Sequence, residues 1–135
     1  MNEEQLKFAA EVNVAVLATV DGKGRPHATP IWYMLDGDEI VLSVGSGGQK
    51  HRNLERNPEV TLVIDSRKVP YYAIMVAGRM EIGPPPNDEE RLALATRYLG
   101  EDVGKRYVEM TAGNDSVSLR LKARKVMEFN GRAGG

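Results

Sequence analysis

The residues best suited to chemistry stand between positions 43 and 58, in the stretch SVGSGGQKHRNLERNP. A loop of small residues leads there into a short basic helix pattern. Accessible backbone N–H groups, the positive end of a helix and a lysine together favour an anion such as a phosphate. The alternative is a solvated loop followed by an ordinary helix with surface cations. The candidate anion ligands are the backbone amides of Ser46, Gly47 and Gly48 and the side chains of Lys50, Arg52 and Arg56.

Other residue types that often carry chemistry form no recognisable site. The chain has no cysteine, which excludes disulfides, thiolate nucleophiles and cysteine-ligated metals. His27 and His51 have no partners at metal-ligand spacing, so no metal site is predicted. Asp36 and Asp38 flank a glycine and are interpreted as turn residues. The sequence therefore names no catalytic side chain.

Length and charge narrow the possible functions. A chain of 135 residues suits one domain, residues 1–135, with its own hydrophobic core. A formal net charge of −1 argues against nucleic-acid binding, which usually needs a strongly basic surface. No apolar run reaches the length of about 20 residues that spans a membrane, and no secretion signal is recognised. A cytoplasmic protein without a membrane or nucleic-acid partner is expected.

The apolar pattern predicts a mainly β protein, a six-stranded antiparallel barrel with flanking helices. Residues 12–20 are almost continuously apolar, which predicts a strand buried on both faces. Gly78 inside an otherwise strand-like segment indicates a bulge. Asn87 and Gly100 are suited to start and end a helix. The predicted strands cover residues 12–20, 26–35, 39–44, 59–65, 71–82 and 116–131.

Four segments in this order resemble a known family. They are VAVLATVDGKGRPHATPIWYML, GQKHRNLERNPEVTLVID, VAGRMEI and SLRLKARKVMEFNG, which together extend over nearly the whole chain. The pattern resembles the pyridoxamine 5′-phosphate oxidase-like split β-barrel family, also known as the FMN-binding split barrel. Within that family it is most similar to the branch that uses the deazaflavin coenzyme F-420.

The resemblance implies a homodimer with two cofactor sites between the subunits. It implies that the cofactor ring lies along the strand Thr29 to Trp32, which includes Pro30 and Ile31. It also implies that the cofactor phosphate lies at the loop and helix that hold Ser46, Gln49, Lys50 and Arg52. Tyr72 begins a strand from which a partner subunit would reach the site. Trp32 could instead be a core residue.

The implied function is an oxidoreductase that transfers a hydride from reduced F-420 to a small conjugated acceptor, biliverdin-, quinone- or enone-like. One alternative is an FMN-binding flavin reductase or oxidase of the same fold. Another is a carrier that binds a flavin or deazaflavin without turnover. A cationic groove extended by Arg52, Arg56 or Arg67 and Lys68 would suit the long anionic tail of F-420 better than the shorter FMN.

Overall fold

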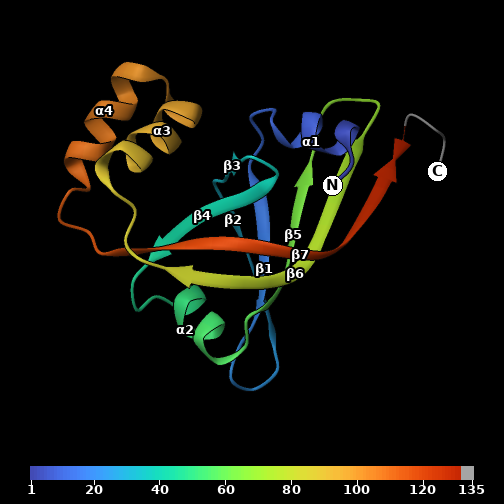
Figure 1. Ribbon diagram of the computed structural model, residues 1–135, viewed down its shortest axis with the longest axis horizontal. Coiled ribbons are helices and arrows are strands. Elements are labelled where there is room, and N and C mark those ends of the chain that lie inside the picture. Colours follow the sequence, from blue (N-terminus) through green and yellow to red (C-terminus); the bar gives the residue numbers. More distant parts are fainter. Residues whose placement is uncertain (132–135) are drawn as a thin grey trace.

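Seven antiparallel strands form one sheet in the computed structural model, which describes residues 1–131 (Figure 1). The strands are β1 (Ala15–Val20), β2 (Pro26–Ile31), β3 (Met34–Asp36), β4 (Glu39–Gly45), β5 (Glu59–Asp65), β6 (Tyr72–Gly83) and β7 (Ser116–Asn130). The helices are α1 (Glu3–Ala9), α2 (Gln49–Arg56), α3 (Asp88–Leu99) and α4 (Glu101–Met110).

The order of the strands requires the sheet to curl into a barrel. That order is β2-β1-β5-β6-β7-β4-β3, so the two edge strands, β2 and β3, follow one another in the chain. Only Trp32 and Tyr33 separate them, and such a link spans at most roughly 11 Å. The two edges must therefore lie close together. The predicted antiparallel split barrel is confirmed, with seven strands in place of six.

The additional strand arises because the predicted strand over residues 26–35 is interrupted at Trp32 and Tyr33. The Tyr33 side chain is 0% exposed, and its backbone N–H donates to the Tyr98 hydroxyl of α3 at 3.2 Å. Its own hydroxyl donates to the carbonyl of Ala9, at the end of α1, at 2.7 Å. Burial raises the pKa of Tyr33 to about 12. A buried tyrosine with polar partners near two helices thus sets the point where the strand breaks.

The core is built from alternate residues of the strands, as the period of two requires. On β1, Leu17 and Thr19 point inward and are at most 1% exposed. Val16 and Val20, on the outward face, remain partly exposed. The prediction that residues 12–20 are buried on both faces is therefore wrong for the single chain.

Gly78 lies at a β-bulge between β6 and β7, as predicted. The register changes between Ala77, which pairs with Lys125, and Gly78, which pairs with Ala123. A side chain at position 78 would collide with the backbone carbonyl of Lys122. The close approach of the two strands therefore requires glycine at this position.

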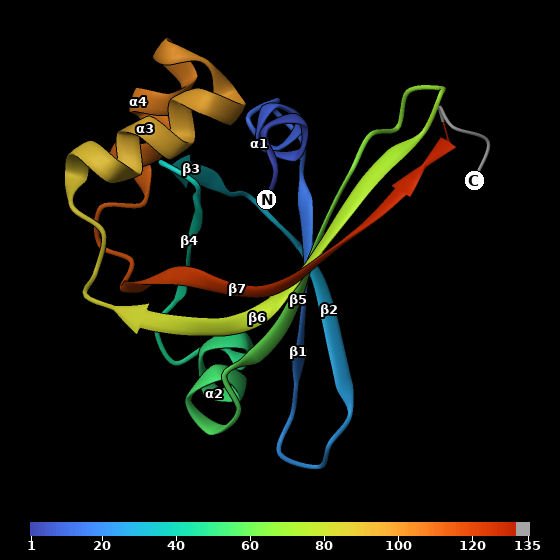
Figure 2. The same cartoon turned by 45° about the vertical axis from the view of Figure 1, so that its right-hand side comes forward.

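The helices lie at different parts of the barrel (Figure 2). Helix α2 lies at the end opposite α1, and α3 and α4 form a hairpin beside β3 and β4. Asn87 caps α3 in a reciprocal pair with Glu90, and Gly100 ends it with a φ of 84°, both as predicted. No helix within residues 1–131 is long and apolar enough to cross a membrane.

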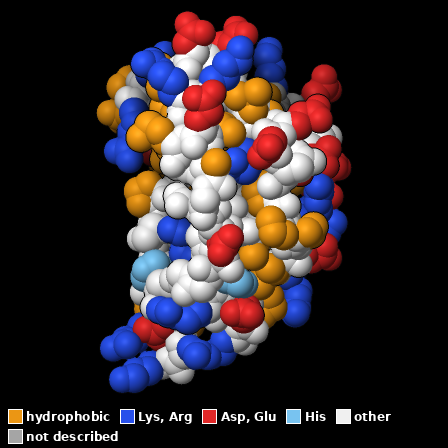
Figure 3. All heavy atoms as spheres, turned by 90° about the vertical axis from the view of Figure 1, so that its left-hand side faces the viewer, with side chains coloured by type: hydrophobic (Ala, Val, Ile, Leu, Met, Phe, Trp, Pro, Cys, Tyr) orange, Lys and Arg blue, Asp and Glu red, His pale blue; other side chains and the backbone are white. Residues whose placement is uncertain are grey.

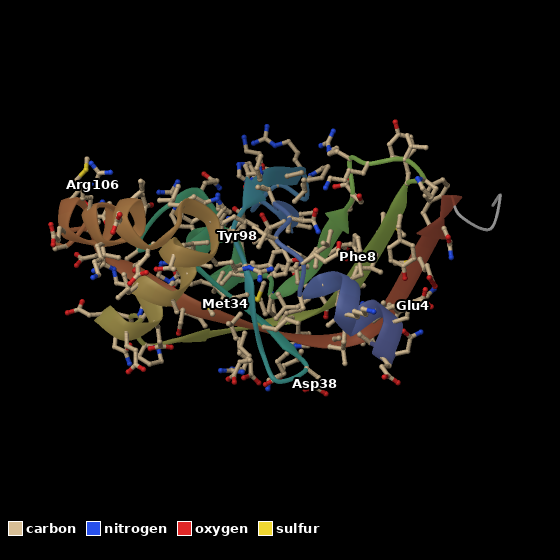
Figure 4. All side chains as sticks on the ribbon, turned by 90° about the horizontal axis from the view of Figure 1, so that it is seen from above. Glu4, Phe8, Met34, Asp38, Tyr98 and Arg106 are labelled. Carbon is tan, nitrogen blue, oxygen red and sulfur yellow. The ribbon has the colours of Figure 1, made fainter. Side chains whose placement is uncertain are left out.

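One end of α3 attaches the hairpin to the barrel. Arg97 donates to the carbonyls of Ala10 at 3.1 Å and Glu11 at 2.8 Å, just beyond α1. The Tyr98 hydroxyl donates to the carbonyl of Asn13 at 2.7 Å, where the hairpin meets the barrel (Figure 4). The remainder of α3 packs chiefly on α4, which leaves room between α3 and the sheet.

Candidate cofactor site

A buried hydrogen bond anchors α2 on the barrel. Asn53 is 0% exposed, and its Nδ2 donates to the hydroxyl of Thr19 on β1 at 3.0 Å. Leu54, 2% exposed, adds an apolar contact with the core. A buried polar group that loses its partner costs about 1–3 kcal/mol, so this pair specifies how α2 sits against β1.

The loop before α2 does not present free amides. The N–H of Ser46 donates to the carbonyl of Asp115 at 3.0 Å. The N–H of Gly47 donates to Nδ1 of His51 at 2.9 Å, and that of Gly48 donates within the loop at 3.2 Å. The prediction of accessible amides in this loop is therefore wrong, because the loop is folded onto its neighbours. The Ser46 side chain remains exposed beside it.

The available donors lie slightly further along, in the first turn of α2. Gly48 precedes the helix without a side-chain cap, and the first turn holds no acidic residue. The N–H groups of Gln49, Lys50 and His51 begin the helix and have no carbonyl one turn earlier to accept them. This helix end also carries the positive end of the helix dipole. It therefore suits an anion.

Lys50 connects this helix end with strand β2. Its half-buried side chain donates from Nζ to the hydroxyl of Thr29 at 3.0 Å. A threonine hydroxyl is a neutral partner and leaves the ammonium charge available to an anion. Lys and Arg side chains gather at the end of the molecule that holds α2 and the β1–β2 turn (Figure 3). An ammonium beside helix N–H groups fits the phosphate of a flavin or deazaflavin cofactor.

Two other predicted ligands stabilise the loop. Arg52 donates to the carbonyl of Gly47 at 3.1 Å and to Oε1 of Gln49 at 2.9 Å. The Gln49 amide donates in turn to Oδ1 of Asn53 at 2.7 Å. Both side chains lie beside the helix end, and their hydrogen bonds hold the loop against it.

The remaining predicted cations do not extend this site into one groove within the chain. The guanidinium of Arg56 lies against Gly22 in the β1–β2 turn, where a side chain would collide with it. Arg67 and Lys68 belong to the β5–β6 loop, and Arg67 pairs with Asp65 at 3.4 Å. That loop lies at the end of the barrel opposite α2 (Figure 1).

Tyr72 is not brought to the site either. Its side chain is 1% exposed, and its ring packs edge-on against Phe8 of α1 with centroids 4.7 Å apart. Its hydroxyl donates to the carboxylate of Glu128 at 2.6 Å. Phe8 is labelled beside α1, away from Tyr98 (Figure 4). Within the single chain the Tyr72 side chain therefore belongs to the core and does not reach the site around Lys50.

Strand β2 leads from α2 to a cavity of about 440 Å³ under the helical hairpin, here termed the first cavity. Pro30, Ile31 and Trp32 line it. The Trp32 ring stacks on Tyr98 with centroids 4.9 Å apart and meets Tyr107 of α4 at 5.5 Å. Trp32 therefore both packs against the hairpin and forms a wall of the cavity. The volume lies within the usual range for small-molecule sites, about 300–1,000 Å³.

Three residues of this region were not predicted. Asn53 stands next to Leu54, the apolar residue of α2 that faces the core. That position beside an apolar residue was the one sign in the sequence that Asn53 is buried. Tyr98 and Tyr107 were not assigned a role in the site. The contacts of these residues join segments far apart in the chain, so a local sequence pattern does not predict the contacts.

Comparisons with known proteins support the split-barrel fold. A family model described as pyridoxamine 5′-phosphate oxidase matches residues 1–130. A conserved hypothetical protein of Mycobacterium tuberculosis is 28% identical, with 98% of this chain and 86% of that chain covered and a TM-score of 0.82. An F-420 reductase is 25% identical, with 94% and 98% covered and a TM-score of 0.76. A heme binding protein from Mycobacterium smegmatis is 26% identical, with 97% and 58% covered and a TM-score of 0.66.

The match over residues 1–130 identifies the class, a split-barrel oxidoreductase family related to flavin and deazaflavin chemistry. The chain belongs to the pyridoxamine 5′-phosphate oxidase family.

Proposed function

We propose that the protein is an F-420-dependent reductase that transfers a hydride to a small conjugated acceptor, biliverdin-, quinone- or enone-like. The observation that carries the proposal is the continuity of three features. The Lys50 ammonium and the uncapped end of α2 adjoin Thr29, and the next three residues of the chain line the first cavity. A phosphate group and a ring system joined by a short linker match this arrangement. The similarity to a protein named as an F-420 reductase supports the deazaflavin over other rings.

The residues of the chain bind and orient the cofactor and the acceptor, and the cofactor provides the redox chemistry. When bound, the reduced deazaflavin would supply a hydride, which together with a proton from water would reduce one double bond of the acceptor. The backbone of β2 would hold the ring, and Trp32 with the hairpin would shield the first cavity from bulk water.

We propose further that two copies form a dimer through the outward face of the barrel. Val16, Val63, Met75 and Met127 are paired in register across β1, β5, β6 and β7 and form an apolar row on that face. Met127 is 36% exposed and Phe129, two residues later, 49% exposed in the single chain. An apolar row of this extent on an antiparallel sheet favours burial against a partner.

The dimer is tested by sedimentation equilibrium. The measured molecular mass of the wild-type protein should be twice the 14.9 kDa of one chain. Val63→Arg should shift the measured mass towards that of a monomer. Ala112→Arg, in the turn after α4, adds the same charge away from the row and should leave the dimer intact. A monomeric wild-type protein, or equal effects of the two variants, would contradict the proposed interface.

FMN is the alternative cofactor, and one observation favours it. Within residues 1–131, no row of cations leads away from Lys50 and the start of α2. Arg52 is hydrogen-bonded to the loop, and Arg56 lies at the β1–β2 turn. One terminal phosphate needs no more than this cluster. The long anionic tail of F-420 would need cations elsewhere, for example from the second subunit.

Binding of oxidised F-420 and of FMN, measured side by side by fluorescence, tests the assignment. The proposal expects tighter binding of F-420, followed by acceptor-dependent oxidation of the reduced coenzyme. A preference for FMN would assign the protein to the flavin enzymes. Tight F-420 binding without turnover on quinones, enones or biliverdin would indicate a carrier, and binding of neither cofactor would refute the phosphate site.

A further inference from the structure

A second cavity lies on the other side of α3. It has a volume of about 600 Å³ and is formed by α3, the segment before it, and strands β3, β4, β6 and β7. Ser43, Arg91 and Leu94 line this second cavity and the first cavity alike. The two cavities are therefore neighbours that share these three side chains. The place where they adjoin is here termed the junction, with Ser43 of β4 as its floor and the two α3 side chains as its roof.

The roof of this junction is held in place by α4. Arg91 donates from Nη2 to the hydroxyl of Thr111 at 2.7 Å and to the carbonyl of Val108 at 3.2 Å. Its pairing with Asp88, at 3.5 Å, involves a carboxylate whose side chain is 96% exposed, and is correspondingly weak. Arg91 is thus oriented mainly by neutral partners on α4 and in the turn after it.

The lining of the second cavity combines a larger apolar set of residues with a smaller charged set in which acidic residues predominate. Its apolar members are Met34, Leu35, Val41, Leu42, Ile82, Pro84, Pro86, Ala93, Leu94 and Leu119. Its charged members are Asp36, Glu81, Glu89, Glu90, Arg91 and Arg120, so carboxylates outnumber cations. Arg120 is moreover engaged by Asp36 at 2.8 Å and by Glu39 at 3.0 Å. An anionic group would be repelled there, whereas an uncharged hydrocarbon would be buried favourably.

We infer that the acceptor carries an uncharged hydrocarbon tail, and that the second cavity binds this tail. The reducible ring lies in the first cavity against Trp32, and the tail passes beneath α3 between Ser43 and Leu94. This inference rests on the proposed function and narrows its acceptor class. A quinone- or enone-like ring with an apolar chain fits both cavities, and a tetrapyrrole bearing several carboxylates does not.

Trp32 is the single tryptophan of the chain and lines the first cavity, so its fluorescence reports binding directly. The probes are benzoquinones with the same ring and either no tail, a ten-carbon alkyl tail, or a ten-carbon tail that ends in a carboxylate. Affinities are measured for the purified protein, alone and with F-420 or FMN. The alkyl tail should tighten binding at least tenfold over the tailless ring, and the terminal carboxylate should remove most of that gain.

Ala93→Phe places a bulky ring in the second cavity alone, since Ala93 does not line the first. This variant should reduce the gain from the alkyl tail to less than threefold while the tailless quinone keeps its affinity. Ala112→Phe, which lines neither cavity, is the matched control and should behave as wild type. A tail that gives no gain in the wild type, or the same gain in Ala93→Phe, overturns the inference.

The quinone titrations without cofactor separate this inference from the proposed function. A tail-dependent gain that Ala93→Phe abolishes supports the second cavity even if neither F-420 nor FMN binds, a result that would refute only the cofactor assignment. Tight F-420 binding with no effect of the tail would refute only the second cavity as a tail site.

Discussion

Replacement of Lys50 by methionine tests the centre of the proposed site. Lys50→Met keeps an unbranched, flexible side chain of similar length and removes the charge that lies 3.0 Å from Thr29. Hydrogen bonds to charged groups contribute about 1.5–3 kcal/mol, and about 1.4 kcal/mol corresponds to a factor of ten in affinity. The dissociation constant of the cofactor should therefore rise roughly 10- to 100-fold.

Arg56→Met is the matched control for this change. It removes one positive charge from the same helix, but its guanidinium lies at Gly22 and not beside Thr29. Its effect on affinity should stay within about threefold, the size expected of screened surface charges. Thr29→Val removes the hydroxyl that orients Lys50. Its loss of cofactor affinity should lie between the losses of Arg56→Met and Lys50→Met.

The assay is a fluorescence titration at two salt concentrations, with urea unfolding of each variant alongside. The wild-type affinity should fall more steeply with salt than that of Lys50→Met, because a charge pair has been lost. Equal losses of cofactor affinity in Lys50→Met and Arg56→Met would show that only the total positive charge of α2 matters, and not the position of Lys50. Unchanged affinity in Lys50→Met would refute the phosphate site outright.

Three further predictions concern the framework around the site. Asn53→Ala should lower the free energy of unfolding by about 1–3 kcal/mol, measured by urea titration, and a cycle with Thr19→Val should be non-additive because the two side chains share a hydrogen bond. Gly78→Ala should destabilise by about 1–3 kcal/mol because its Cβ meets the backbone of β7, whereas Gly113→Ala, which meets open space, should change stability by less than about 0.5 kcal/mol; similar values for both would contradict the packing at the bulge. Burial raises the pKa of Tyr33 to about 12 from 10.0, so the unfolded chain releases this proton first and stability should fall between pH 10 and 12; Tyr33→Phe should lose part of that alkaline slope, and an unchanged slope would show that other groups cause it.

Several features of the fold were predictable because their causes are local. Alternating apolar residues specify strands, and Asn87 and Gly100 specify the ends of α3 through capping and a positive φ. Gly78 was predictable as a bulge because glycine is costly inside a strand unless the backbone needs it. The interruption at Trp32 and Tyr33 was not, since it depends on partners that α1 and α3 bring from elsewhere.

The features of the candidate site likewise divide into those with local causes and those that depend on contacts between distant segments. The sequence by itself determined that Lys50 follows a small-residue loop at the start of a helix, because helix N-termini and their charges are set by adjacent residues. Only the tertiary structure decided that the carbonyl of Asp115 takes up the amide of Ser46, and that Tyr72 is buried against Phe8. The cavities beneath α3 likewise exist only once the hairpin is anchored at one end. Neighbouring residues determine which groups a segment offers, whereas contacts between distant segments determine which of those groups remain free to bind.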